Sequence, residues 1–317
     1  CVPAFGVTLY FATTSGFAQS NMSSHVPLAR DSARNKVIVI TGARFSYALI
    51  QHWIDKYHAT DSNTRIVIAP RGTQDPGTYD ILAEAFEPGE EFRKQREYTY
   101  VARYAVLPVG NASSAFAGVY SRKGLTANFI KQLFFHDPFA DQEKRQTIRE
   151  SYSIYTRLQK AGASTVFASH FGFQQQDMKG KAIAGSDEHL CQAILRDTIA
   201  VTCLPLSLIY DPSTRKVRPG ITVLPVDLDG NGKIADDEKF YDNLDRVLDG
   251  LERTPSAKLK GLPVAQFHLS VNKEHPDPDA VAFIKWIVSN GLTDLHHFGF
   301  MLNAQHENTF TAHESPK

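Results

Sequence analysis

Apolar residues along this chain occur in two patterns, short continuous runs and repeats at every fourth position. Residues 37–40 and 65–68 are runs rich in Val and Ile, which predicts buried strands. Between them, residues 45–57 carry a large apolar side chain at every fourth position, which predicts a helix with one apolar face. Strand, helix and strand in this order indicate an α/β fold with a parallel sheet.

The same patterns continue along most of the chain and predict two lobes. The run at residues 98–109 is longer than an ordinary strand of about 5–6 residues, so we expect it to cross from one lobe to the other. A second long run at residues 264–271 would return the chain. Lobe 1 would then contain residues 36–103 and 267–305, and lobe 2 residues 104–266. Further strands are expected at residues 153–156, 200–204 and 221–226, and further helices at residues 126–135, from 162 onward, and at 187–195, 237–251 and 278–289.

The N-terminal region predicts export. Residues 1–18 carry no charge, and Gly16, Phe17 and Ala18 fit the small-x-small pattern of a signal-peptide cleavage site. We therefore expect a signal-peptide remnant and a periplasmic or extracytoplasmic protein. Two alternatives stay open, a lipidated Cys1 that would anchor the protein to a membrane and an apolar N-terminal strand. The Ser-, Asn- and Arg-rich residues 19–35 predict a disordered leader, and residues 306–317 a frayed tail.

Charge and cysteine content narrow the classes of partner. The chain has 34 Lys and Arg residues against 34 Asp and Glu residues, whereas nucleic-acid-binding domains usually show a basic excess. We therefore expect no nucleic-acid partner. Three cysteines are too few for a disulfide scaffold and lack the spacing of a zinc site. Cys191 and Cys203 would either pair in an oxidising compartment or lie apart as buried thiols.

Three junctions between an expected strand and an expected helix carry residues suited to an anion: residues 41–46, residues 71–73, and Arg157 with residues 161–165. A helix N-terminus has unpaired N–H groups and a partial positive charge, and Gly lets a ligand approach the backbone closely. Arg donates two parallel hydrogen bonds to an oxyanion. In open α/β sheets these junctions lie where ligands bind. Each junction alone is also what an ordinary helix cap requires.

Taken together, several motifs resemble the PstS-type phosphate-binding proteins, the extracytoplasmic receptors of phosphate ABC transporters. The resemblance covers about residues 36–302 and is closest to a subgroup common in Bacteroidetes. It rests on Ile40-Thr41-Gly42-Ala43-Arg44-Phe45 with Trp53, on residues 103–111, on Gly124-Leu125-Thr126, on Tyr155-Thr156-Arg157 with Gly162-Ala163-Ser164 and Phe167, and on Phe283, Trp286 and Phe298-Gly299-Phe300.

This resemblance implies a two-lobed periplasmic-binding-protein fold of type II, in which each lobe is a mostly parallel sheet flanked by helices and two hinge crossovers join the lobes. It implies a binding protein rather than an enzyme. The protein would capture inorganic phosphate or a similar tetrahedral oxyanion, deliver it to an ABC permease and act as a monomer. The ligand contacts that we expect are Arg44, Phe45, Arg71, Thr73, Arg157, Gly162 and Ser164.

The chain departs from the family pattern at the expected site. Arg44, Ala161 and Ala163 replace residues that carry hydroxyl groups in the family, and residues 71–73 replace its Gly-Ser-Gly loop. The acidic residue that accepts the proton of phosphate has no clear counterpart, and Glu87 is the nearest. Two other functions therefore stay open, a phosphate-ester hydrolase and a sensor or adhesin that shares the fold without serving a transporter.

A second motif, residues 227–238, matches the spacing of an EF-hand-type calcium loop. Calcium takes about six to eight oxygen ligands, and this spacing would place them around one ion with a structural role. An alternative is an Asp- and Gly-rich turn that caps the following helix. The expected ligands are Asp227, Asp229, Asn231, the carbonyl of Lys233, and Glu238.

Overall fold

The computed structural model describes residues 37–69, 79–87, 89–138, 145–255, 258–259 and 261–303. The predicted signal-peptide remnant, the leader and the C-terminal tail lie outside these residues, as do Arg71 and Thr73. None of the helices among the described residues combines the length and apolar character needed to cross a membrane.

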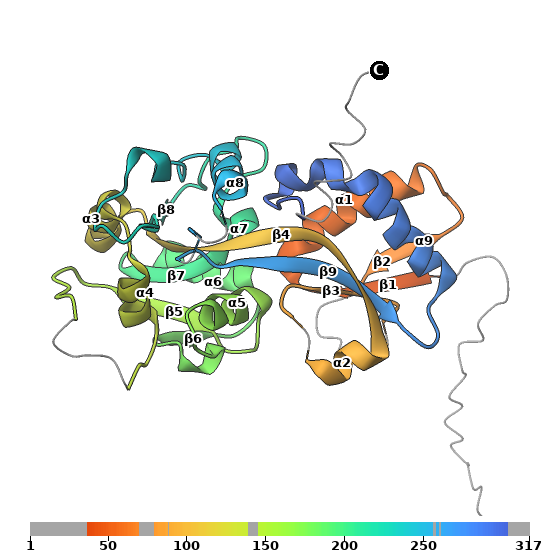
Figure 1. Cartoon of the computed structure of the whole chain (residues 1–317), viewed down its shortest axis with the longest axis horizontal. Coiled ribbons are helices and arrows are strands. Elements are labelled where there is room, and N and C mark those ends of the chain that lie inside the picture. The colour runs from red at the N-terminus through yellow and green to blue at the C-terminus, as the bar shows by residue number, and fades with distance from the viewer. Residues whose placement is uncertain are drawn as a thin grey trace, which may run out of the picture. The chain divides into compact units, whose positions relative to one another are not determined.

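The described strands form one nine-stranded sheet in the order β2-β1-β3-β9-β4-β7-β5-β6, with β8 paired to β4 (Figure 1). The runs expected to be strands are confirmed, most with small extensions, but the strand expected at residues 221–226 already ends at Val223. Strands β3 and β6 were not predicted. The bounds are β1 Val37–Gly42, β2 Arg65–Ile68, β3 Ile81–Glu84, β4 Arg96–Asn111, β5 Ser153–Arg157, β6 Lys181–Ile183, β7 Ala200–Pro205, β8 Ile221–Val223 and β9 Val264–Asn272.

Strand direction divides the sheet into two halves. In the first half β1 is parallel to β2 and β3, and in the second half β5 is parallel to β6 and β7. The long strands β4 and β9 lie side by side and antiparallel between them (Figure 1). The pairing of β4 passes from β9 at Ala105 to β7 at Val106, as expected for a strand that crosses from one half to the other. The fold is therefore α/β with two strand crossovers.

Helices lie at each position where the sequence predicted one, and α2, α3 and α7 are additional helices that it did not predict. Trp53 is fully buried on the apolar face of α1, and its Nε1 donates to the carbonyl of Gly291 at 2.8 Å. Thr126 caps α4 by accepting a hydrogen bond from the Phe129 amide at 3.2 Å. The bounds are α1 Tyr47–His58, α2 Glu90–Gln95, α3 Ala115–Lys123, α4 Ala127–Phe134, α5 Gly162–His170, α6 Asp187–Arg196, α7 Leu206–Ile209, α8 Leu244–Arg253 and α9 Pro278–Trp286.

Two helix predictions are wrong at one end. The helix expected at residues 237–251 is a short 3-10 turn, Asp236–Glu238, followed by a loop, and α8 begins at Leu244. The reason is local, since the side chain of Asn243 accepts a hydrogen bond from the Asp245 amide at 2.8 Å and caps a new helix. The helix expected at residues 278–289 is α-helical only to Trp286 and continues as a π turn.

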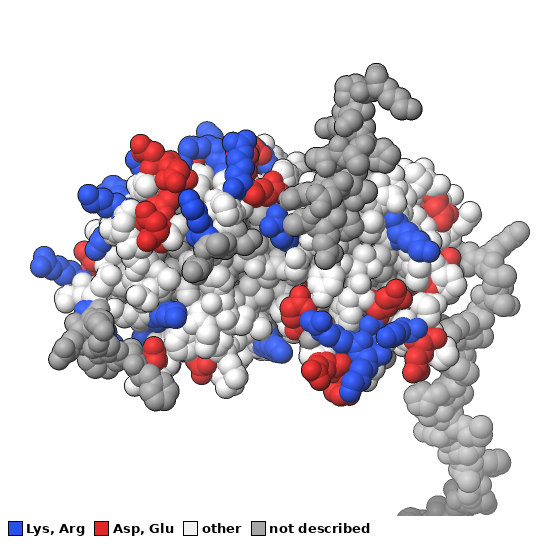
Figure 2. All heavy atoms as spheres, in the orientation of Figure 1, with Lys and Arg blue, Asp and Glu red and all other residues white. Residues whose placement is uncertain are grey.

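Two further features of the described residues are the state of the two cysteines and the distribution of charged side chains on one face of the molecule. Cys191 and Cys203 are free thiols, and burial raises the pKa of both. On the face drawn in Figure 2, acidic and basic side chains are interspersed. Around α2 they form ion pairs, among them Lys94 with Glu91 at 2.8 Å.

Candidate functional site

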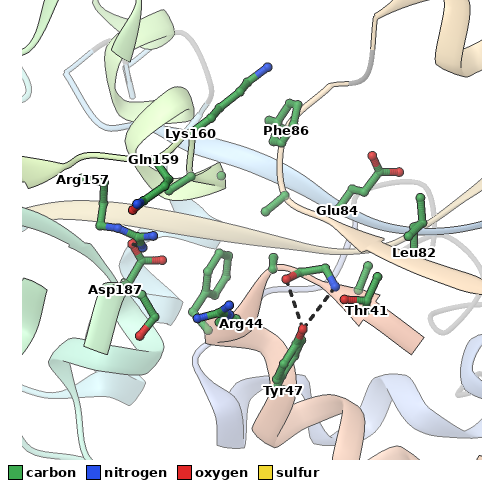
Figure 3. A pocket seen from close by; sticks show the side chains of 18 of the residues that line it. Thr41, Arg44, Tyr47, Leu82, Glu84, Phe86, Arg157, Gln159, Lys160 and Asp187 are labelled. Atoms are coloured by element: carbon green, nitrogen blue, oxygen red, sulfur yellow. Dashed lines mark hydrogen bonds and ion pairs between the residues drawn. The ribbon is translucent and has the colours of Figure 1, made fainter. Parts of the chain in front are cut away.

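A cavity of about 750 Å³ opens where the two halves of the sheet meet. Its walls come from the β1–α1 junction, from β3 and the loop after it, from the β5–α5 loop and from the start of α6 (Figure 3). Of the expected ligand residues, Arg44, Phe45, Arg157 and Gly162 border this cavity. The structure thus brings together two of the three predicted junctions, and the third, with Arg71 and Thr73, is outside the described residues.

Tight backbone packing holds the β1–α1 junction in place. Gly42 has a φ of +141°, and a Cβ there would overlap the carbonyl of Ala83 on β3, so only glycine fits. The next amide, that of Ala43, donates to the same carbonyl at 2.8 Å. This packing fixes where the first helical turn, Arg44–Ser46, faces the cavity.

The first turn presents a free guanidinium to the cavity. No hydrogen bond joins Arg44 to another described residue, and its side chain points into the cavity (Figure 3). The neighbouring Phe45 borders the cavity but has its ring in the core, 4.9 Å from the ring of Tyr104 and 6.0 Å from that of Phe300. Phe45 therefore supports the wall rather than offering an aromatic surface to a ligand.

Arg157 forms the charged end of the cavity. Its Nη1 donates to Asp187 Oδ1 at 2.7 Å, and its Nη2 donates to the carbonyl of Gly185. The two side chains are only 8% and 9% exposed, and Nε of Arg157 is buried without a hydrogen-bond partner among the described residues. A buried, unpaired donor of a charged group is costly, so the contacts with Asp187 and Gly185 leave this guanidinium only partly satisfied.

Asp187 is a site residue that the sequence reasoning missed. It begins α6 and borders the cavity beside Arg157 (Figure 3). Burial raises the pKa of its carboxyl, although the Arg157 guanidinium acts in the opposite direction. Glu87, the residue expected to come nearest to this role, instead pairs with Arg93 at 2.5 Å and does not border the cavity. The signal in the sequence was the Gly-Ser-Asp start of a fourth strand-to-helix junction, residues 185–187.

The α5 N-terminus supplies unpaired backbone donors. Its N-cap residue, Ala161, makes no side-chain cap, so the first-turn amides have no intrahelical acceptor. Gln175 braces the loop, accepting from the Ala161 amide at 2.9 Å and donating to the Gln159 carbonyl at 2.9 Å. Gly162 borders the cavity, whereas Ser164 is buried within the helix and does not border it. The hydroxyl contact of Ser164 with a ligand therefore stays a prediction.

The acidic loop at residues 227–238 brings its carboxylates together. Oxygen atoms of Asp227, Asp229 and Glu238 all lie within 4.8 Å of one another, and the first and last of these residues are buried. Glu238 accepts from the backbone amides of Leu228 at 2.6 Å and Ala235 at 2.9 Å. Asn231 is beside this group, donating to Asp229 at 2.7 Å. Three convergent carboxylates are the hard oxygen ligands that calcium prefers.

Comparison with known proteins identifies the fold. No family model matches the chain, and no curated protein matches it. Among solved structures, a phosphate ABC transporter substrate-binding protein with bound phosphate from Clostridium perfringens is 12% identical and superposes with a TM-score of 0.61, covering 84% of this chain and 100% of its own. An ABC-type phosphate transport receptor from Vibrio cholerae is 13% identical with a TM-score of 0.56, over 84% of this chain and 100% of its own.

Regulatory domains share the same architecture. The CcmR regulatory domain from Synechocystis, in complex with 2-PG, is 11% identical with a TM-score of 0.50, over 81% of this chain and 97% of its own. At these identities the similarity concerns the fold alone, and the chain has the fold of the type II periplasmic binding proteins that these phosphate receptors also show.

Proposed function

We propose that this protein is an extracytoplasmic solute-binding protein whose cavity captures phosphate or a similar tetrahedral oxyanion for an ABC transporter. The observation that carries the proposal is that Arg44, Arg157 and the N-terminus of α5 border one cavity. Export, delivery to a permease and a monomeric state are parts of the same proposal, and a fold common to transport receptors supports them.

The electrostatics of the charged end favour an anion. Arg44, Arg157 and Lys160 border this part of the cavity, whereas Asp187 is the acidic residue there. The N-termini of α5 and α6 also begin at the cavity, and each adds a partial positive charge. Positive groups therefore exceed negative ones even though Asp187 neutralises part of the charge on Arg157.

Asp187 gives the charged end a means to choose among oxyanions. A carboxylate accepts a hydrogen bond from a protonated oxyanion such as hydrogen phosphate but repels one without a proton, such as sulfate. Because Asp187 is buried beside Arg157, this discrimination would operate with little screening by water. In this proposal, Asp187 is the acidic residue that accepts the proton of phosphate, for which the sequence showed no clear counterpart.

Calorimetric titration of the purified protein tests the proposal. We expect saturable binding of phosphate, binding of sulfate at least about tenfold weaker, and a smaller difference between the two anions in an Asp187→Asn variant. Arg246→Ala is the matched control, because Arg246 pairs with Asp242 on the surface. If folded wild-type protein binds neither anion, the proposal is wrong.

We further propose that the loop at residues 227–238 binds calcium as a structural ion. The convergence of Asp227, Asp229 and Glu238 and the position of Asn231 support this. The ion would brace the second half of the molecule, because Leu228 packs against its core.

A further inference from the structure

The cavity is large for a bare oxyanion. Its volume of about 750 Å³ is in the range of about 300–1,000 Å³ that is typical of sites for organic ligands. Inorganic phosphate, with one phosphorus atom and its oxygens, would fill only a small part of it. The two halves already come close together at Gly162. A Cβ on Gly162 would lie 2.8 Å from Cβ of Ala85. Nearby, Nζ of Lys160 is 4.7 Å from the ring centroid of Phe86.

The end of the cavity opposite Arg157 is built to accept hydrogen bonds. Glu84 lies there with Thr41 and Leu82 (Figure 3). Its Oε2 accepts a hydrogen bond from Ser270 Oγ at 3.2 Å and is 3.7 Å from Nε2 of the fully buried His268. The side chain of Glu84 is 15% exposed, so the carboxylate is held in place and keeps part of its surface free.

A carboxylate at this end repels a second anion and accepts hydrogen bonds from neutral hydroxyl groups. The lining of the cavity is partly apolar, and Phe86, Phe92 and Tyr79 border it. Phe92 is 43% exposed, and the organic part of a ligand would cover it with a gain in apolar burial. The end at Arg157 favours an anionic group and the end at Glu84 favours hydroxyl groups. One molecule that is anionic at one end and hydroxylated at the other would suit both.

We infer that the cavity binds a phosphomonoester with a hydroxyl-bearing organic group, with the phosphate group beside Arg157 and the hydroxyl groups toward Glu84. This inference rests on the proposed function, since it keeps the oxyanion at the same end of the cavity. It adds Glu84 and Phe92 as specificity-determining residues.

The test is calorimetric titration of the full chain with inorganic phosphate, glycerol 3-phosphate, ribose 5-phosphate and ribose. We expect at least one ester to bind about tenfold more tightly than inorganic phosphate, a ratio that one hydrogen bond to a charged group supplies. Glu84→Gln should lower ester affinity about tenfold and leave phosphate affinity unchanged. Phe92→Ala, at an exposed position that does not threaten folding, should weaken ester binding alone. Glu91→Gln, an exposed neighbour on α2, is the control.

The outcomes separate the two proposals. If inorganic phosphate binds as tightly as every ester, or Glu84→Gln and Phe92→Ala change phosphate and ester binding equally, the phosphomonoester inference is overturned and the oxyanion function stands. If the folded protein binds neither phosphate nor any ester, both are overturned.

Discussion

The cavity and the acidic loop both gather buried charged groups, but they do so over very different distances along the chain. The carboxylates of the loop belong to residues 227–238, and backbone amides of the same loop hold them. In the cavity, Arg157 at the end of β5 pairs with Asp187 at the start of α6, and the β1–α1 junction depends on Ala83 of a different strand. A local site needs only its own sequence, whereas an assembled site needs the packing of the whole sheet.

This difference predicts how each region fails. A substitution in the acidic loop should act mainly through the ability of the loop to hold an ion, so its effect should depend on whether that ion is present. A substitution at the charged end of the cavity should lower the free energy of unfolding as well as ligand affinity. The reason is that the charged groups there are compensated by distant partners rather than by nearby backbone amides.

The largest effect is expected for Arg157→Ala. It leaves Asp187 buried without its cation, which costs about 3–5 kcal/mol of unfolding free energy, and it removes a guanidinium from the cavity lining, so anion binding should be lost. Urea denaturation and calorimetry measure the two effects. A double variant, Arg157→Met with Asp187→Leu, should recover most of the stability without recovering binding. Unchanged phosphate affinity in a folded Arg157→Ala protein would remove Arg157 from the site.

Gly42→Ala should come next. The φ of +141° at this position strains any other residue by about 1–3 kcal/mol, and the new Cβ meets the Ala83 carbonyl. We expect a loss of about 3 kcal/mol or more in urea denaturation. The control is Gly118→Ala in α3, where no atom lies within 4 Å of the new Cβ and stability should rise by about 0.5–1 kcal/mol. Equal effects at both positions would refute the packing argument.

Calcium should stabilise the protein through the acidic loop. At free calcium about 100-fold above its Kd, the gain in unfolding free energy is about 2.7 kcal/mol, seen as a higher thermal midpoint than in chelator. Glu238→Gln should abolish this shift, whereas Asp237→Asn, an exposed neighbour, should retain it. A wild-type midpoint that does not respond to calcium favours the alternative, a turn that caps without metal.

The smallest effect concerns a partly exposed pair between distant segments. The hydrogen bond that His296 donates to the Glu252 carboxylate raises the pKa of His296 above 6.5, despite an opposing effect of burial. Burial would raise the pKa of Glu252, but His296 and the Leu302 amide outweigh it and hold that pKa below 4.5. The stabilisation from His296 is therefore complete below about pH 6.5 and is lost as the pH rises through its folded-state pKa. The contribution of Glu252 is present above about pH 4.5 and is lost in more acidic solution.

Because His296 is half-exposed, we expect the pair to contribute less than about 1 kcal/mol. Denaturation of wild type and Glu252→Gln should differ more near pH 6 than near pH 8.5, whereas Asp249→Asn on the same helix should show no such dependence. A Glu252→Gln effect that is equal at both pH values would contradict the assignment.

The fold was more predictable from sequence than the site. Several elements follow from signals that act within a few positions, namely apolar runs, apolar residues at every fourth position and cap residues. These elements are the strands β1, β2 and β5 and the helices α4 and α5. The helix predicted at residues 237–251 failed where the Asn243 cap starts a new helix. Asp187 was missed because nothing near it in sequence reveals that its carboxyl lies beside Arg157.

By itself, the sequence determined the α/β order of elements, the long strand that crosses the sheet, the glycine that β1 requires and the contiguous acidic loop. Each of these depends on backbone preferences or on side chains a few residues apart. Only the tertiary structure decided that Arg157 faces Asp187 and that Phe45 belongs to the core. It also decided that Ser164 is buried without bordering the cavity and that Glu84 lies at the end of the cavity opposite Arg157. Those outcomes depend on burial and charge pairing between segments more than a hundred residues apart in some cases, as for Glu84 and Ser270, and such pairing exists only once the sheet has formed.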